Sequence, residues 1–182
     1  KSLHIGQKLY RSRVTPIGQK KIKWDKMGCP PKELTTAGRA NPIGIPYLYL
    51  SDSAKTTYFE VRAVYLDKLS VGTFRIEKDL KLIDFVYDVN LYNDGSVPLK
   101  ETIIKKKVIE AISSDLSKPL RRYDSEIEYV PIQLICEYCR RIVDSEGATA
   151  DGITFESSLH KGGRNYVLFD ESAAKCIRVD SH

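Results

Sequence analysis

The 182-residue sequence has few cysteines and no long apolar segment. Four cysteines are too few for a disulfide scaffold, so a reducing, cytoplasmic setting is expected. No apolar run approaches the roughly 18 residues that a transmembrane helix needs, and no membrane contact is expected. The chain begins with Lys1 rather than Met, which is compatible with a domain excised from a longer protein. Its length predicts a single domain over residues 1–182.

Motifs of several common catalytic sites are also missing. The sequence contains neither a G-x-S-x-G elbow nor a phosphate-binding loop of the G-x-G-x-x-G or P-loop type. Its three histidines are far apart, and His160 is interpreted as a surface residue in a turn. Cys136 and Cys139 form a lone C-x-x-C on the apolar face of a helix. They are therefore predicted to pack in the core, and no metal site is expected.

The charge of the chain is mildly basic, with a formal net value of +5. The basic residues are scattered and mostly fit solvated helix faces, although one or two could serve a pocket for an anionic ligand. A nucleic-acid surface needs basic residues interleaved with exposed aromatic residues, and no such pattern is found. No nucleic-acid contact is therefore predicted.

Apolar periodicity and turn residues predict both strands and helices. The strands are expected at residues 9–14, 47–50, 69–76, 80–86, 152–158, 165–169 and 174–179. The helices are expected at residues 53–63, 100–116 and 131–143. Because these elements do not alternate strictly, the predicted fold class is α+β.

Two details of this prediction bear on function. The helix at 100–116 should turn its lysines outward and bury a face made of Ile104, Val108, Ala111 and Ile112. Residues 15–46 are rich in Gly, Pro and Lys and should form a long irregular excursion. Such long loops are uncommon in compact domains unless they have a function.

Polar residues with a candidate chemical role occur in several predicted elements. Arg39 and Glu60, of opposite charge, stand near the two ends of one strand-to-helix unit, and Arg11, Tyr49 and Ser157 lie elsewhere. Each has an ordinary explanation as a surface charge, strand residue, helix residue or turn residue. A polar site would need them together, and the sequence alone does not show that they meet.

Six segments in a fixed order resemble the RES domain, a family named for an arginine, a glutamate and a serine. They are "LYRSR", "GRANPIGIPYLYL", "TTYFEVRA", "VPIQLICEYCRR", "GITFESS" and "GGRNYVLF". The resemblance implies a compact fold similar to the catalytic core of ADP-ribosylating toxins, with a mixed central sheet and flanking helices. It also implies consumption of NAD, and known members include the toxins of bacterial toxin–antitoxin pairs.

The resemblance also implies a set of site residues. The catalytic residues would be Glu60, Arg39, Tyr49 and Ser157 (or the adjacent Ser158), and the residues that bind NAD would be Arg11, Arg39, Tyr49 and Asn165. Arginine suits the diphosphate oxygens of NAD. Glu60 would stabilise the positive charge that develops on the ribose when the glycosidic bond breaks. Tyr49 would stack on nicotinamide, and Ser157 would orient the ribose or the ring.

Three functions remain open at this point. The first is an NAD-degrading enzyme that uses water or inorganic phosphate, acting as a bacterial toxin or anti-phage defence effector. The second is an ADP-ribosyltransferase that modifies a macromolecule through the same pocket, and the third is a catalytically silent interaction module. An enzyme of the first kind needs control by an antitoxin-like protein or a regulatory domain. The expected contact is the segment 15–36, with its lysines and Trp24.

Overall fold

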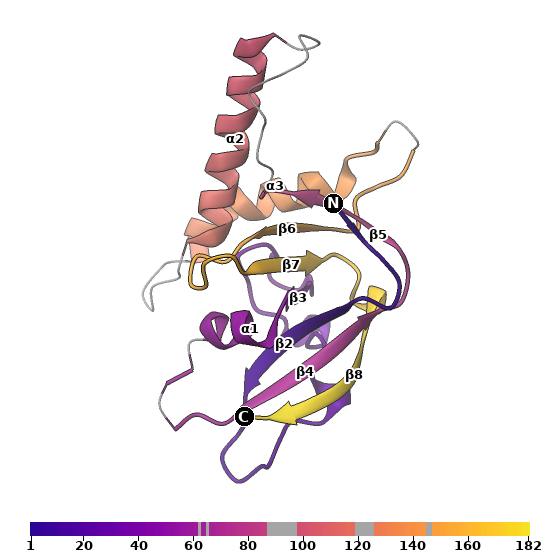
Figure 1. Cartoon of the computed structure of the whole chain (residues 1–182), viewed down its shortest axis with the longest axis vertical. Coiled ribbons are helices and arrows are strands. Elements are labelled where there is room, and N and C mark those ends of the chain that lie inside the picture. Colours follow the sequence, from indigo (N-terminus) through magenta and orange to yellow (C-terminus); the bar gives the residue numbers. More distant parts are fainter. Residues whose placement is uncertain (62, 65, 87–97, 119–125, 145–146) are drawn as a thin grey trace.

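The structure is a computed structural model that describes the chain except residues 62, 65, 87–97, 119–125 and 145–146 (Figure 1). Its strands are β1 (Ser2–Leu3), β2 (Lys8–Val14), β3 (Leu48–Ser51), β4 (Leu69–Ile76), β5 (Leu80–Asp84), β6 (Gly152–Glu156), β7 (Arg164–Leu168) and β8 (Ala174–Ser181). Its α-helices are α1 (Ala54–Glu60), α2 (Leu99–Ser117) and α3 (Val130–Arg141). Short 3-10 helices occur at η1 (Trp24–Lys26), η2 (Lys32–Leu34), η3 (Glu126–Tyr129) and η4 (Glu171–Ala173). Every predicted strand and helix is present with slightly different ends, and β1 is an additional strand.

The described strands form one sheet of eight strands in the order β1-β5-β6-β7-β3-β2-β4-β8. Neighbouring strands are antiparallel except β5 and β6, which are parallel. Parallel neighbours need a long crossover connection, and α2 and α3 lie in that connection. The sheet twists strongly, since β6 and β7 run across the view while β2, β4 and β8 run obliquely (Figure 1). The predicted mixed sheet with flanking helices is confirmed.

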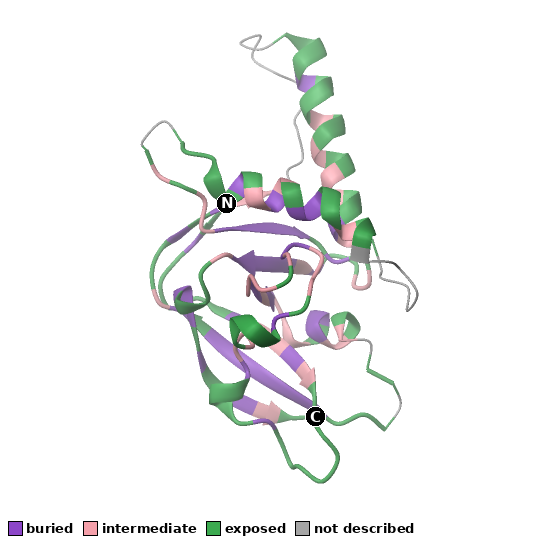
Figure 2. Ribbon diagram, turned by 180° about the vertical axis from the view of Figure 1, so that it is seen from behind, coloured by how far each residue is buried: buried purple, intermediate pink, exposed green. Residues whose placement is uncertain are grey.

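The sheet is buried on both faces around β6 and β7, because successive residues of a strand point to opposite faces. Val167 packs with Ile153 and Phe155 in a core cluster that includes residues of α2 and α3. Tyr166 and Leu168 pack in a second cluster. In Figure 2 most of the strands are buried (purple), whereas much of the helix surface is exposed (green).

Helix α1 begins where the sequence predicts it. Ser53 is the N-cap, and its side chain accepts a hydrogen bond from the backbone N–H of Thr56, a common role of serine. The helix packs on β2, where the hydroxyls of Ser12 and Thr57 are hydrogen-bonded. It ends at Glu60 rather than continuing to residue 63. The glutamate singled out in the sequence therefore stands at the C-terminal end of a short helix.

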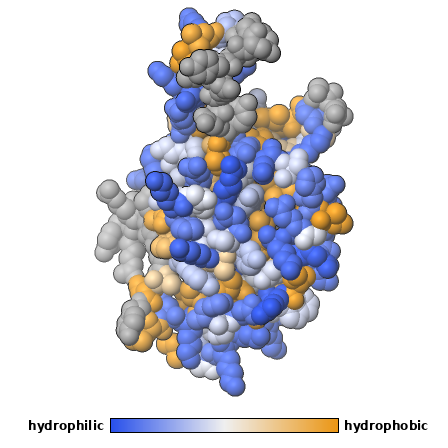
Figure 3. Space-filling view, viewed as in Figure 1, coloured by the Kyte–Doolittle hydropathy of each residue, from blue (hydrophilic) through white to orange (hydrophobic). Residues whose placement is uncertain are grey.

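The prediction of which face of α2 is buried is largely wrong. Of the four predicted residues, Ile112 packs against the core, and three are exposed: Ile104, Val108 and Ala111. The core contacts come from Ile109, Ile112 and Leu116, roughly one residue further along the helix. The N-terminal part of α2 projects beyond the sheet (Figure 1), and hydrophobic residues lie at its surface (Figure 3). Apolar periodicity predicted the helix but not which side the sheet covers.

The segment 15–46 is irregular as predicted, with η1 and η2 as its only helices or strands. It is not confined to the surface, because Ile22 and Met27 belong to the core. Trp24 is 58% exposed, so this residue, unlike its neighbours Ile22 and Met27, is accessible to a partner.

The two cysteines of α3 are buried in the core, as predicted. Burial raises the pKa of the Cys136 thiol to about 12 and raises that of Cys139 as well. Both thiols are therefore protonated at neutral pH and act as small apolar groups. Within the described residues, no three or more His, Cys, Asp or Glu side chains gather in a way that could hold a metal ion.

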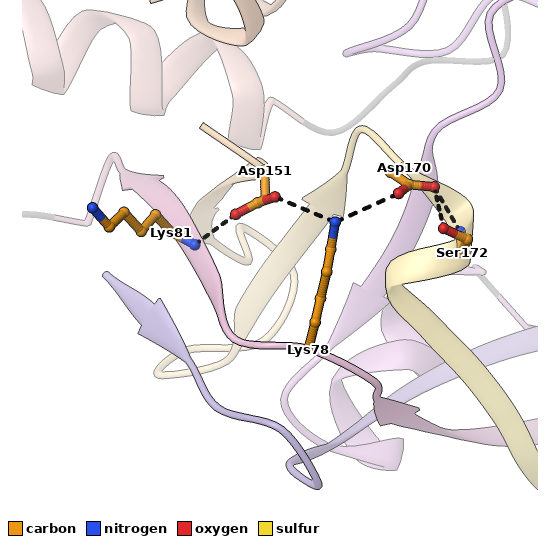
Figure 4. Close-up of polar contacts among 5 residues, drawn as sticks. All are labelled: Lys78, Lys81, Asp151, Asp170 and Ser172. Atoms are coloured by element: carbon orange, nitrogen blue, oxygen red, sulfur yellow. Dashed lines mark hydrogen bonds and ion pairs between the residues drawn. The ribbon is translucent and has the colours of Figure 1, made fainter. Parts of the chain in front are cut away.

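A surface network of ion pairs and hydrogen bonds joins the start of β5 to neighbouring segments (Figure 4). Lys78 Nζ lies 3.8 Å from Asp151 Oδ1 and 3.7 Å from Asp170 Oδ2. Asp151 also accepts a hydrogen bond from the backbone N–H of Lys81, and Asp170 accepts one from the Ser172 hydroxyl. Hydrogen bonds from Ser172 lower the pKa of Asp170. The side chains are partly exposed, so each pair contributes little to stability.

Candidate active site

A cavity of about 490 Å³ lies among β2, β3, α1 and the C-terminal end of α2. Its volume is within the range of small-molecule sites, about 300–1,000 Å³. Five of the six predicted site residues line it: Arg11, Arg39, Tyr49, Glu60 and Asn165. The sixth, Ser157, is hydrogen-bonded to Glu60. The fold thus brings together all six residues, whose proximity the sequence could not show.

Glu60 is held by two hydrogen bonds that reach the same carboxylate oxygen. Ser157 Oγ donates at 2.6 Å and Asn165 Nδ2 at 2.8 Å, both to Oε1. Oε2 accepts no hydrogen bond from the residues that the structure describes. A negative charge at a helix C-terminus opposes the helix dipole, so the placement of Glu60 does not serve the stability of α1. The protein therefore fixes one oxygen of the carboxylate and leaves the other without a hydrogen bond from the described residues.

The two side chains that hold Glu60 are themselves buried. Ser157 is 6% exposed and Asn165 is 8% exposed. Asn165 Oδ1 accepts a hydrogen bond of 2.8 Å from the hydroxyl of Ser51, which directs Nδ2 of the same amide toward Glu60. Ser51 pairs with Asn165 across β3 and β7. Its role was not predicted, because strand pairing is not visible in the sequence.

The two adjacent serines occupy different positions. Besides donating to Glu60, Ser157 Oγ accepts backbone N–H groups from Leu159 at 3.3 Å and His160 at 3.1 Å. Ser158 is exposed and lines the cavity. Ser157, rather than Ser158, is therefore the serine that contacts the carboxylate.

Arg11 reaches the cavity from β2. Its Nη1 is buried and has no hydrogen-bond partner among the described residues. Burial lowers the pKa of Arg11, and the neighbouring Cys29 thiol acts in the opposite direction. Burial likewise raises the pKa of Cys29 to about 11, so this thiol is protonated at neutral pH. An unpaired buried guanidinium nitrogen is costly, and an anionic ligand would satisfy it.

Arg39 lines the cavity from the loop before β3, and its guanidinium binds the end of α2. Nη1 donates to the carbonyl oxygen of Leu116, and Nη2 donates to that of Lys118. The last carbonyls of a helix have no partner within the helix, so Arg39 caps α2. Two of its five N–H donors serve this contact. The sequence predicted a phosphate contact and did not reveal this second role, because the carbonyls lie far along the chain.

The hydroxyl of Tyr49 holds the loop that carries Arg39. It donates to Asn41 Oδ1 at 2.8 Å and accepts the backbone N–H of Ala40 at 3.0 Å. Burial raises the pKa of Tyr49, so the hydroxyl stays protonated. Tyr49 also lines the cavity. Its hydroxyl is committed to the loop.

Gln133 of α3 holds the same loop from the other side and was not predicted. Its Nε2 donates to the carbonyl oxygens of Gly38 at 2.7 Å and Asn41 at 3.1 Å. A Cβ at position 38 would collide with Asn41 Oδ1 and the Tyr49 hydroxyl, so the loop requires glycine there. Gln133 could not be predicted because the sequence shows it only as a polar residue next to the apolar face of α3, not as a buried one.

Comparison with known families gives one family match. Over residues 8–182 the chain matches the family model described as the RES domain, whose members are linked to NAD-related toxin–antitoxin systems. No curated protein matches the chain significantly. None of the helices in the described part of the chain combines the length and apolar character needed to cross a membrane. Because the family match covers nearly the whole sequence, the chain belongs to the RES domain family.

Proposed function

We propose that this chain is an NAD-degrading enzyme that cleaves the bond between nicotinamide and ribose. The observation that carries the proposal is the Glu60 carboxylate, anchored through Oε1 by Ser157 and Asn165 at the wall of the cavity. Family membership supports a role related to NAD. We also propose that the fold is similar to the catalytic core of ADP-ribosylating toxins.

The proposed reaction uses the free oxygen of Glu60. When the bond between ribose C1 and the nicotinamide nitrogen breaks, both electrons leave with nicotinamide, and the ribose becomes oxocarbenium-like. Oε2 of Glu60 would stabilise this positive charge. Because Oε1 is already held by two donors, the carboxylate needs little reorganisation during the reaction. Water or inorganic phosphate then attacks C1 through an oxygen and loses a proton to solvent.

The arginines would bind the other part of the substrate. Arg11 lines the cavity, and its buried Nη1 has no hydrogen-bond partner among the described residues. A diphosphate oxygen would supply the missing acceptor with a charge-assisted bond. Arg39 would contribute a second contact while it caps α2. Tyr49 lines the cavity, and its ring would stack on nicotinamide.

Incubating the purified chain with NAD, with and without phosphate, tests the proposal. Chromatography should show nicotinamide under both conditions if water is the acceptor, and only with phosphate present if phosphate is the acceptor. ADP-ribose as the second product identifies water as the acceptor, and phosphorylated ADP-ribose identifies phosphate. Intact NAD under both conditions would refute the enzyme function and leave an interaction module.

A macromolecular acceptor is the second candidate, and one observation favours it. A further cavity of about 560 Å³ is lined by α2 and by residues that follow β5 and β6. It shares Ser117 and Ser158 with the first cavity, so the site borders a second hollow at the surface. An ADP-ribosyltransferase acting through this site would leave label from NAD on a protein or nucleic acid in a cell extract, whereas the NAD-degrading enzyme would label neither.

We also propose that the activity is toxic and controlled by an antitoxin-like partner or a regulatory domain, in a cytoplasmic setting. The exposed Trp24 and the lysines of the segment 15–36 support this segment as the contact. Expression of the wild-type chain in bacteria should stop growth and lower cellular NAD, while the Glu60→Gln variant should do neither. Normal growth and unchanged NAD with both chains would contradict toxicity.

A further inference from the structure

His160 lies in the turn between β6 and β7 and contacts two elements of the site. The sequence predicted a surface residue, but the side chain is half-buried against α1. Its Nδ1 lies 2.9 Å from the hydroxyl oxygen of Thr56. Its ring stacks on Phe59 with centroids 5.3 Å apart and planes 8° from parallel. Thr56 is one helical turn before Glu60, and Phe59 is adjacent to it.

The backbone of His160 contacts the other half of the site. Its N–H donates to Ser157 Oγ at 3.1 Å, and its carbonyl oxygen accepts the N–H of Gly163 at 2.9 Å. One residue therefore joins the helix that carries Glu60 to the hydroxyl that holds Glu60 Oε1. The covalent chain does not connect these parts closely, since Glu60 and Ser157 are 97 positions apart.

The hydrogen bonds of the Thr56 hydroxyl determine which ring nitrogen of His160 carries a proton. The Thr56 hydroxyl has a single proton, and it donates to the carboxylate oxygen Asp52 Oδ1 at 2.7 Å. Thr56 Oγ1 must therefore accept from His160, which places a proton on Nδ1. This donor is present in both the neutral and the protonated ring. The contact should persist whether or not His160 is charged.

Glycine at position 163 leaves room for this contact. A Cβ there would lie 2.7 Å from Thr56 Oγ1 and 2.8 Å from His160 Nδ1. Any side chain at 163 would force the two groups apart. The close approach between the turn and α1 therefore explains Gly163, the second glycine of "GGRN".

We infer that His160 is a positioning residue for the proposed reaction: it locks α1 to the turn and so keeps Ser157 within hydrogen-bonding distance of Glu60. The inference rests on the proposed function for its kinetic consequence but not for its geometry. Loss of the lock should let the end of α1 and the turn separate. A displacement of about 1 Å at a reacting group can reduce a rate by about 100-fold.

Paired variants test the lock. His160→Phe keeps a ring to stack on Phe59 but removes the donor, whereas His160→Asn retains an N–H donor at the position of Nδ1. With NAD as substrate, His160→Phe should lower kcat by about 10-fold or more with KM within about 2-fold. His160→Asn should restore most of kcat, and Gly163→Ala should behave like His160→Phe. The control is His4→Phe, an exposed histidine outside the cavity, which should leave turnover unchanged.

Two further measurements separate this inference from other roles of His160. Thr56→Val combined with His160→Phe should lower kcat no more than the stronger single change, because each substitution already removes the bond between Thr56 and His160. An additive loss would overturn the inference, as would a wild-type kcat for His160→Phe. If His160→Asn removes a limb of the pH–rate profile, His160 transfers a proton instead of positioning Ser157.

A crystal structure of the His160→Phe variant decides the geometry without any activity. The inference predicts that Ser157 Oγ moves beyond hydrogen-bonding distance of Glu60 Oε1. An intact bond in that variant would overturn it. Absence of NAD turnover in the wild-type chain would refute the proposed function alone, because the structural comparison would still decide the role of His160.

Discussion

Replacing Glu60 with Gln tests the centre of the proposed mechanism with little change in shape. The amide oxygen of Gln can take the place of Oε1 and accept from Ser157 and Asn165, now 2.6 and 2.8 Å away. Bonds to a charged acceptor are worth about 1.5–3 kcal/mol and neutral ones about 0.5–1.5 kcal/mol. The exposure of Glu60 reduces this difference, and removing a negative charge from the end of α1 regains about 0.3–1 kcal/mol. The free energy of unfolding should therefore change by only about 1 kcal/mol.

The rate should respond far more strongly than the stability. Oε2 becomes an amide nitrogen and can no longer stabilise positive charge on the ribose, so NAD turnover should fall by about 100-fold or more, as when other preorganised groups are removed. Turnover is measured by chromatography of nicotinamide, and folding by thermal unfolding. Glu33→Gln, an exposed glutamate in η2, is the matched control and should retain full activity. Wild-type turnover by a folded Glu60→Gln protein would remove Glu60 from the mechanism.

Three other substitutions have distinct expected outcomes. Arg39→Lys keeps the charge but loses the planar fork that reaches Leu116 and Lys118. Calorimetry on the Glu60→Gln background should therefore show NAD affinity weaker by about 1–3 kcal/mol. Unchanged affinity would mean that Arg39 caps α2 without binding NAD. Tyr49→Phe leaves Asn41 Oδ1 and the Ala40 N–H without the hydroxyl, and urea unfolding should show a loss of about 1–3 kcal/mol; no loss would mean that other contacts hold the loop. Cys139→Ala should lower stability by roughly 1 kcal/mol through lost packing with little effect on NAD turnover, whereas one zinc per chain in metal analysis would contradict the packing role.

The family and the residue types of the site could be predicted because the motif segments are short and continuous. "GRANPIGIPYLYL" places Arg39 and Tyr49 in one strand unit, and the serine N-cap of α1 explains why Glu60 follows in a helix. The buried face of α2 could not be predicted in the same way. A helix with apolar residues around much of its circumference satisfies the periodicity in several orientations, and packing against the sheet selects one.

The sequence by itself determined the family, most of the secondary structure and the identity of the charged and polar side chains, because local periodicity, caps and motif order depend on neighbouring residues. Only the tertiary structure decided what those side chains do. Asn165 and Ser157 hold one oxygen of Glu60, Arg39 caps a helix 77 residues away, and His160 locks the turn to α1. These contacts join residues far apart in the chain. They depend on strand pairing and on the packing of the helices, which bring both partners of each hydrogen bond together.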